Sequence, residues 1–193
     1  MSDDEAFARL VSLACHDIRT PLATVQGFAR TLERLSKLEP PADRYVHLIV
    51  EGSAQMAEIL DQLALLARFE AERYEPVVES KDTLELAQSA AERLGDEAEA
   101  RGEGEEVKVD VEDTERALAS LGRCAARHGG VEHVTFEAQG PEIVISPITA
   151  EAAPIVLGLE LKDFGAAIAV RLIDELGGSV ALDGERLVVG LRA

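Results

Sequence analysis

The chain is poor in the residues that small folds use for bulk and for cross-linking. It has no tryptophan, its aromatic residues make up 4% of the sequence, and it has two cysteines, Cys15 and Cys124. Two cysteines are too few for a disulfide framework and do not make a metal-binding pair, and they fit a reduced, cytoplasmic setting. Aliphatic side chains must therefore do the packing, and hydrophobic residues at 47% suffice for a core.

Basic residues are also scarce. There are 19 of them against 37 acidic residues, so the net charge is −18. Binding to nucleic acid needs clustered lysine and arginine, and an anionic membrane surface would repel so acidic a chain. No apolar run reaches about 18 residues, so no transmembrane helix is expected. We therefore expect neither nucleic acid nor a membrane as a partner.

Two long helices are predicted over residues 4–37 and 42–73, separated by Pro40-Pro41. Their apolar residues recur at steps of three and four, which is typical of a buried helix face. The predicted seam is Phe7, Val11, Ala14, Ile18, Leu22, Val25, Ala29 and Leu32 in the first helix and Tyr45, Ile49, Gly52, Met56, Ile59, Leu63 and Leu66 in the second. One antiparallel hairpin buries these seams poorly, so we expect a homodimer that forms a four-helix bundle.

His16 is predicted to point away from this seam. It lies two residues from both Ala14 and Ile18, and a turn of about 100° per residue directs its side chain outward. Asp17 is its neighbour, and Thr20 follows one turn later on the same face. A neutral imidazole is a good nucleophile near pH 7, and an adjacent carboxylate can hold the N–H of its other nitrogen. Such a histidine can accept a phosphoryl group if a partner supplies the phosphoryl group and the metal.

The stretch His16-Asp17-Ile18-Arg19-Thr20-Pro21-Leu22 resembles the H-box of bacterial two-component sensor histidine kinases, which reads roughly H-[DE]-x-[RK]-[TN]-P-L. Every fixed position of that box is matched. The resemblance implies that His16 accepts the phosphoryl group and that Asp17 orients the ring and accepts its proton. It implies that Thr20 positions a water for dephosphorylation of a partner's phospho-aspartate. It also implies that residues 1–75 form a dimerisation and phosphotransfer hairpin.

The remaining residues, 76–193, predict an α+β layer and make the whole chain α+β. Helices are predicted over residues 82–101, 113–128 and 162–176, with Asp82 and Asp113 as caps of the first two. A turn is predicted at residues 102–104. Strands are predicted at residues 77–78 and 107–111, and hairpins at residues 134–145 and 180–191.

This second half resembles the catalytic and ATP-binding domain of histidine kinases in degenerate form. Ser120 and Cys124 stand where the family's N-box has asparagines, and Asp163 stands where the G-x-G-L segment has its first glycine. Residues 146–161 hold no counterpart of the D-x-G-x-G box. Cysteine is a poor ligand for Mg²⁺, and Asp163 would put a negative charge where phosphates should lie. We therefore predict no ATP binding, no cofactor or metal on this chain, and no autokinase activity.

The resemblance implies receiver domains of response regulators as partners, with Mg²⁺ bound by the receiver, and an upstream histidine kinase as a further partner. The candidate docking residues are Arg19, Gln26, Phe28 and Arg30. Phe28 is predicted to lie off the seam, where it either anchors a receiver or packs against the second helix or the dimer mate. Arg19 is predicted to pair with a receiver or with nearby Asp17 or Glu33.

Three functions are consistent with these features. The first is a histidine phosphotransferase that passes phosphoryl groups between His16 and receiver aspartates without ATP, as stand-alone phosphotransferases with a degenerate ATPase-like domain do. The second is a divergent sensor histidine kinase, which would bind ATP. The third is a non-catalytic pseudokinase that binds receivers and blocks them.

Overall fold

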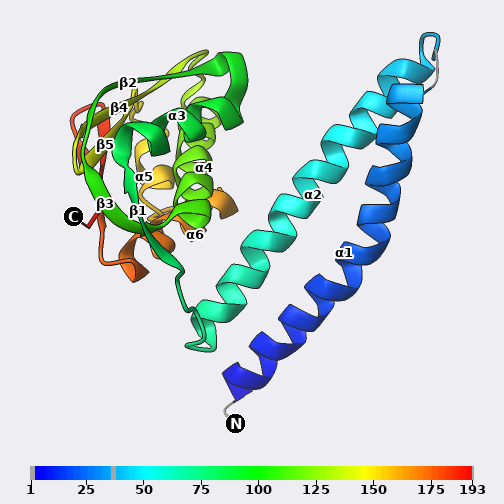
Figure 1. Cartoon of the computed structure of the whole chain (residues 1–193), viewed down its shortest axis with the longest axis horizontal. Helices are drawn as coiled ribbons and strands as arrows, with labels where there is room; N and C mark the ends of the chain where they lie inside the picture. Colours follow the sequence, from blue (N-terminus) through cyan, green and yellow to red (C-terminus); the bar gives the residue numbers. More distant parts are fainter. Residues whose placement is uncertain (1–2, 36–37, 193) are drawn as a thin grey trace. The chain divides into compact units, whose positions relative to one another are not determined.

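The computed structural model describes residues 3–35 and 38–192, and the chain divides into two compact units, Met1–Tyr74 and Glu75–Ala193. The first unit is a helical hairpin of α1, Asp3–Leu35, and α2, Ala42–Glu70 (Figure 1). The end predicted for the first helix, Lys37, lies outside the described residues. The second helix ends at Glu70 and not at Arg73, because Glu72 adopts a positive φ of 52° that an α-helix does not accommodate.

The interior of the hairpin follows a strict repeat of seven residues. The buried positions that carry this repeat are Ala8, Cys15, Leu22 and Ala29 on α1 and Val46, Ser53, Leu60 and Ala67 on α2. Cys15, Leu22 and Leu60 form one packed cluster between the helices. A seven-residue spacing keeps one face of each helix turned to its neighbour over the whole length of the hairpin.

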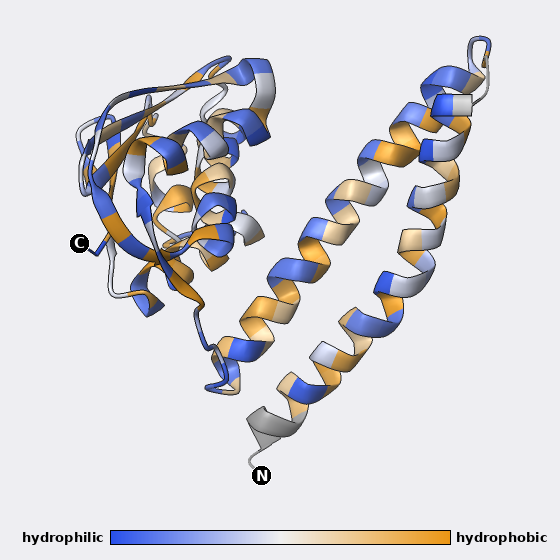
Figure 2. Ribbon diagram, in the orientation of Figure 1, coloured by the Kyte–Doolittle hydropathy of each residue, from blue (hydrophilic) through white to orange (hydrophobic). Residues whose placement is uncertain are grey.

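Within the single hairpin most large side chains of the predicted seam are exposed, in line with the expectation that one hairpin buries these seams poorly. Leu22 and Ala29 are buried as predicted, but a second set of apolar residues remains exposed, here called the outer stripe: Phe7, Ile18, Val25, Leu32, Tyr45, Ile49, Met56 and Ile59. Figure 2 shows hydrophobic residues recurring along the full length of both helices. Small residues such as Ala8 and Ala67 fill the hairpin interior, because they let two helices approach closely. The outer stripe lies one residue before or three residues after these interior positions, a rotation of about 60–100° around the helix.

Among the described residues, no helix is both long enough and apolar enough to cross a membrane. The outer stripe is therefore an apolar strip on helices that are otherwise rich in polar residues. In this single chain the stripe lacks a covering partner: Phe7 and Ile59 are 69% and 52% exposed. Exposed apolar rows of this kind mark association surfaces.

The second unit contains a two-stranded and a five-stranded sheet (Figure 1). In the small sheet β1, Val78–Asp82, pairs antiparallel with β3, Glu106–Asp110. The large sheet has the order β2-β4-β5-β7-β6, with β2 parallel to β4 and every other pairing antiparallel. Its strands are β2 Ala98–Gly104, β4 Val134–Gly140, β5 Glu142–Ser146, β7 Arg186–Gly190 and β6 Ser179–Asp183.

The helices of this unit pack on one face of the large sheet (Figure 1). They are α3 Thr83–Leu94, α4 Val111–Gly129, the short α5 Ala153–Val156 and α6 Phe164–Glu175, and a 3₁₀ turn at Gly95–Glu97 follows α3. Phe136, Ile143 and Leu187 from the sheet are fully buried beneath them, together with Leu118 of α4 and Leu172 of α6. The core is aliphatic, as the scarcity of aromatics requires.

The α+β class and both predicted hairpins, β4–β5 and β6–β7, are confirmed. Asp82 caps α3 as predicted, accepting a hydrogen bond from the Leu84 N–H at 2.7 Å. The helix predicted to reach Arg101 and the turn at 102–104 were wrong, because Gly95 takes a positive φ and the next residues pair with β4 as β2. The cap of α4 is Asp110 and not Asp113: its carboxylate accepts the Asp113 N–H at 3.2 Å.

Candidate functional site

His16 lies near the middle of α1 with its side chain in solvent. Its imidazole is 76% exposed, whereas the preceding residue, Cys15, is buried in the hairpin. The seven-residue repeat causes this contrast, because Cys15 is one of the interior positions and the next side chain turns away from it by about 100°. A bulky partner can therefore reach the ring without any opening of the hairpin.

Asp17 contacts the histidine ring. Nδ1 of His16 lies 3.2 Å from Oδ1 of Asp17, and both side chains are mostly exposed. A carboxylate only accepts hydrogen bonds, so in the neutral ring this contact assigns the proton to Nδ1 and leaves the lone pair on Nε2. Pro21 has no N–H, so the Asp17 carbonyl also lacks the usual helical donor four residues later. The arrangement presents Nε2 as a nucleophile.

Arg19 makes a contact that the sequence did not predict. Its guanidinium donates to Oδ1 of Asp61 on α2 at 2.7 Å, so it bridges the two helices and does not pair with Asp17 or Glu33. Glu33 instead faces His47, which lies 3.2 Å from it. Arg19 stays about half exposed and can still meet an incoming acid.

Thr20, Gln26, Phe28 and Arg30 continue along α1 towards the hairpin tip. Thr20 and Arg30 are exposed, Gln26 is half-buried, and Phe28 is 70% exposed at the edge of the outer stripe. Of the two packing alternatives for Phe28, contact with α2 is excluded by this exposure. Its ring is available either to a partner protein or to a second copy of the chain.

A second polar cluster lies in the sheet unit, where α4 meets the start of α6. Asp163 Oδ2 is 3.3 Å from Nε2 of His128 and 3.4 Å from a guanidinium nitrogen of Arg127. The other oxygen of Asp163 caps α6 by accepting the Ala166 N–H at 3.0 Å. Cys124 is buried beside this carboxylate, and burial, followed by the negative charge of Asp163, raises the pKa of its thiol to about 12.

Cys124, His128 and Asp163 bring one metal-ligating atom each to within 4.8 Å of one another. The sequence reasoning missed this group because it asked only whether the two cysteines could pair. The i, i+4 spacing of Cys124 and His128, which places both on one face of a helix, was the available signal. Asp163 is brought to them only by the packing of α6 against α4.

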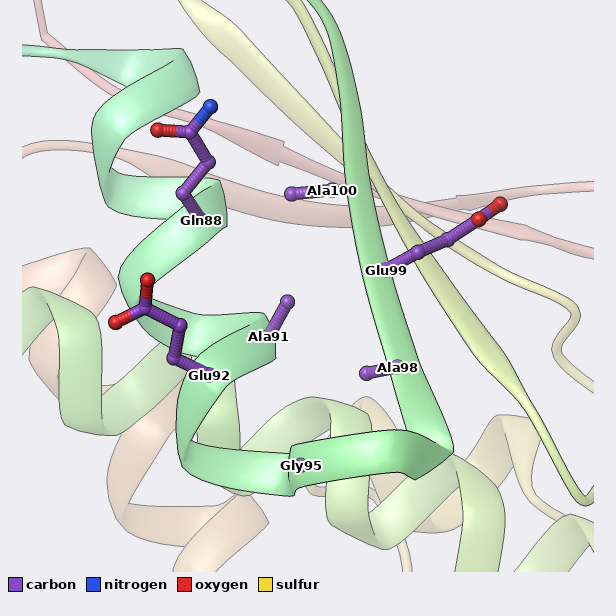
Figure 3. Close-up of a pocket in the computed structure, with 7 residues that line it drawn as sticks. All are labelled: Gln88, Ala91, Glu92, Gly95, Ala98, Glu99 and Ala100. Atoms are coloured by element: carbon purple, nitrogen blue, oxygen red, sulfur yellow. The ribbon is translucent and has the colours of Figure 1, made fainter.

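A shallow hollow between α3 and β2 is a separate feature. Figure 3 shows Gln88, Ala91 and Glu92 on the helix and Ala98 and Ala100 of the strand directed towards it, whereas Glu99 projects away from the helix. None of the seven residues that line it is basic: Gln88, Ala91, Glu92, Gly95, Ala98, Glu99 and Ala100. With no cationic side chain in its lining, the hollow is unsuited to a nucleotide triphosphate.

Comparison with known proteins finds a domain match in the hairpin and similar proteins for the chain as a whole. Residues 8–72 match the His Kinase A (phospho-acceptor) domain. The chain is 26% identical over 91% of its length to the uncharacterized sensor-like histidine kinase R01002 of Rhizobium meliloti, and 24% identical over 88% to the histidine protein kinase DivJ of Caulobacter vibrioides. The hairpin is therefore a His Kinase A domain, and the chain as a whole is similar to two-component histidine kinases. It spans about a third or less of these relatives, 34% and 28% of their lengths.

Two solved structures share the fold of both units. Full-length ShkA in complex with AMPPNP aligns with a TM-score of 0.63 and 21% identity, over 96% of this chain and 46% of that one. The histidine kinase AdeS of Acinetobacter baumannii aligns with a TM-score of 0.54 and 16% identity, over 92% of this chain and 98% of that one. The hairpin is thus the His Kinase A part, and the sheet unit has the fold of the family's ATPase-like domain.

Proposed function

We propose that this chain is a histidine phosphotransferase, which passes phosphoryl groups between His16 and receiver aspartates without using ATP. One contrast supports the proposal. The phospho-acceptor hairpin presents an exposed His16 held by Asp17, while in the sheet unit the start of α6 is already capped by the carboxylate of Asp163. The first half can accept a phosphoryl group, and the second half is poorly suited to supply one.

Phosphoryl transfer at His16 would use the free ring nitrogen. The Nε2 lone pair attacks the phosphorus of a receiver's phospho-aspartate, the P–N bond forms, and the P–O bond to the aspartate breaks so that the carboxylate leaves. The ring gains positive charge in this step, and Asp17 stabilises it through the Nδ1 contact at 3.2 Å. Mg²⁺ bound by the receiver neutralises the phosphoryl oxygens. In the same proposal Thr20 holds a water for hydrolysis of phospho-aspartate.

The residues around Asp163 do not fit a magnesium–nucleotide complex. The N-terminus of a helix attracts phosphate through its free N–H groups, but at α6 the Asp163 carboxylate already accepts the Ala166 N–H. The same carboxylate holds Arg127 and His128, the nearby cationic and polar donors. Cys124 offers a soft ligand where Mg²⁺ needs oxygen. Each of these points weighs against autokinase activity.

Receivers would dock along the His16 face of α1. At about 100° per residue, Arg19, Thr20 and Arg30 lie within about 60° of His16 around the helix. Gln26 flanks this face towards the hairpin interior and Phe28 towards the outer stripe. In our proposal a homodimer covers the outer stripe, and an upstream histidine kinase charges the receiver that delivers the phosphoryl group.

A second candidate is a divergent sensor histidine kinase. It is favoured by the likeness to ShkA, which extends over both units of this chain, and the ShkA structure contains AMPPNP. That reading requires the α6 N-terminus to release Asp163 when nucleotide binds.

Direct label transfer separates the candidates. The chain is mixed with receiver domains that carry labelled phosphoryl groups from acetyl phosphate, and separately with labelled MgATP. Acid-labile label that reaches the chain only from receivers supports the phosphotransferase, whereas label from ATP supports the kinase. Label from neither source indicates a non-catalytic regulator. His16→Gln should abolish labelling, and His47→Gln, which alters another exposed histidine of the hairpin, should leave it unchanged.

A further inference from the structure

We propose that Cys124, His128 and Asp163 form a binding site for a zinc-like transition-metal ion. The three side chains converge at the junction of α4 and α6, with their ligand atoms within 4.8 Å of one another. This inference does not require the phosphotransferase proposal to hold, because the transfer chemistry proposed there takes place at His16 in the other unit of the chain.

The donor set selects the class of metal. Thiolate, imidazole and carboxylate are the ligands of Zn²⁺ and its neighbours in the first transition row, whereas Mg²⁺ takes oxygen ligands. A tetrahedral zinc site with bonds of 2.0–2.3 Å has ligand atoms about 3.5 Å apart. His128 and Asp163 already lie at 3.3 Å, so modest side-chain movement would close the site.

The backbone already holds the ligands in place. Cys124 and His128 are one turn apart on the same face of α4, a spacing that lets a single helix supply two ligands. Asp163 is fixed by its cap of α6, which uses Oδ1 and leaves Oδ2 directed at His128. The cap thus orients a third ligand that comes from a different helix.

Charge and access are also compatible with a divalent ion. A thiolate and a carboxylate together neutralise two positive charges, and binding would displace Arg127 from Oδ2 of Asp163. Cys124 is fully buried, but the side chains of His128 and Asp163 are 23% and 9% exposed, so the ion enters from their side. With three protein ligands, water fills the fourth position. Because the pKa of the thiol is about 12, binding must release the thiol proton to solvent.

Cobalt(II) is the probe, added to the full chain in the presence of a non-thiol reductant. One equivalent should give a thiolate-to-cobalt charge-transfer band and the visible bands of a four-coordinate ion, and Zn²⁺ should bleach both. Cys124→Ser should remove the charge-transfer band, and His128→Gln or Asp163→Asn should weaken binding at least about tenfold. Circular dichroism checks the fold of each variant, and the His128 and Asp163 variants decide the matter if the Cys124 variant is unfolded.

Matched controls are present in the chain. Cys15→Ala removes the other thiol, and His133→Gln removes an exposed histidine outside the cluster, so both should bind cobalt like the parent. The proposal is overturned if no charge-transfer band appears, if the band survives Cys124→Ser, or if Cys15→Ala removes it. In those cases the three residues are a structural ion-pair cluster only.

Discussion

The outer stripe leads to a direct test of the proposed homodimer, because two adjacent residues of α2 lie on different faces of the helix. Ile59 belongs to the outer stripe and is 52% exposed, whereas Leu60 is 8% exposed in the hairpin interior. Complete burial of such a side chain is worth about 1.5–3 kcal/mol, so the half of Ile59 left exposed offers about 1 kcal/mol to a partner. A two-fold dimer buries two copies, which gives about 2 kcal/mol, or about a thirtyfold weaker dimer for Ile59→Ala.

Sedimentation equilibrium over a dilution series measures the dissociation constant of the dimer, here called the dimer constant. Leu60→Ala is the matched control. Leu60→Ala should lower the free energy of unfolding by about 2–5 kcal/mol at every protein concentration, because it opens a cavity inside each hairpin. The loss of stability in Ile59→Ala should instead disappear on dilution below the dimer constant. The reasoning fails if the parent chain is monomeric throughout the series, or if Ile59→Ala leaves the dimer constant unchanged.

Two further predictions concern pH and the core of the sheet unit. The hydrogen bond that His47 donates to Glu33, together with the charge of Glu51, raises the pKa of His47. The stability that protonated His47 contributes is therefore complete below about pH 6.5 and is lost as the pH rises through the raised pKa of the folded state. The difference in Tm between the parent and His47→Gln should therefore be largest near pH 6 and close towards about pH 9; a constant difference would contradict this. Phe136→Ala should cost about 3–5 kcal/mol in urea unfolding, because its ring is fully buried, whereas Leu161→Ala, at an exposed site in the same unit, should stay within about 0.5 kcal/mol.

Features set by local periodicity were predictable from the sequence. The outward direction of His16 depends only on helical phase relative to its neighbours, and the contact with Asp17 only on adjacency. Both β-hairpins have turn residues between alternating strands. The α3 cap at Asp82 is likewise a local signal, since its carboxylate meets the first free N–H groups of its own helix.

Features set by tertiary contact were not predictable from the sequence. The residues of β2 are rich in alanine and charge and favour a helix by propensity, but their parallel pairing with β4 makes them a strand. Several interior positions of the hairpin were missed because small residues with little hydrophobic signal occupy them, among them Ala8, Ser53 and Ala67. Asp163 reaches His128 only through the packing of α6 on α4, and that packing has no signature in the spacing of the residues.

The seven-residue interval inside the hairpin also restricts how the stem can change in length. Adding seven residues to each helix would keep every interior side chain facing its counterpart on the other helix and would extend the outer stripe by one repeat. Adding one residue to α1 beyond Leu22 would rotate everything distal to it by about 100°, which would turn Ala29 towards solvent and carry Arg30 from one flank of the His16 face to the other. The stem can therefore grow or shrink only in whole repeats if the surface next to the phosphoryl acceptor is to be preserved.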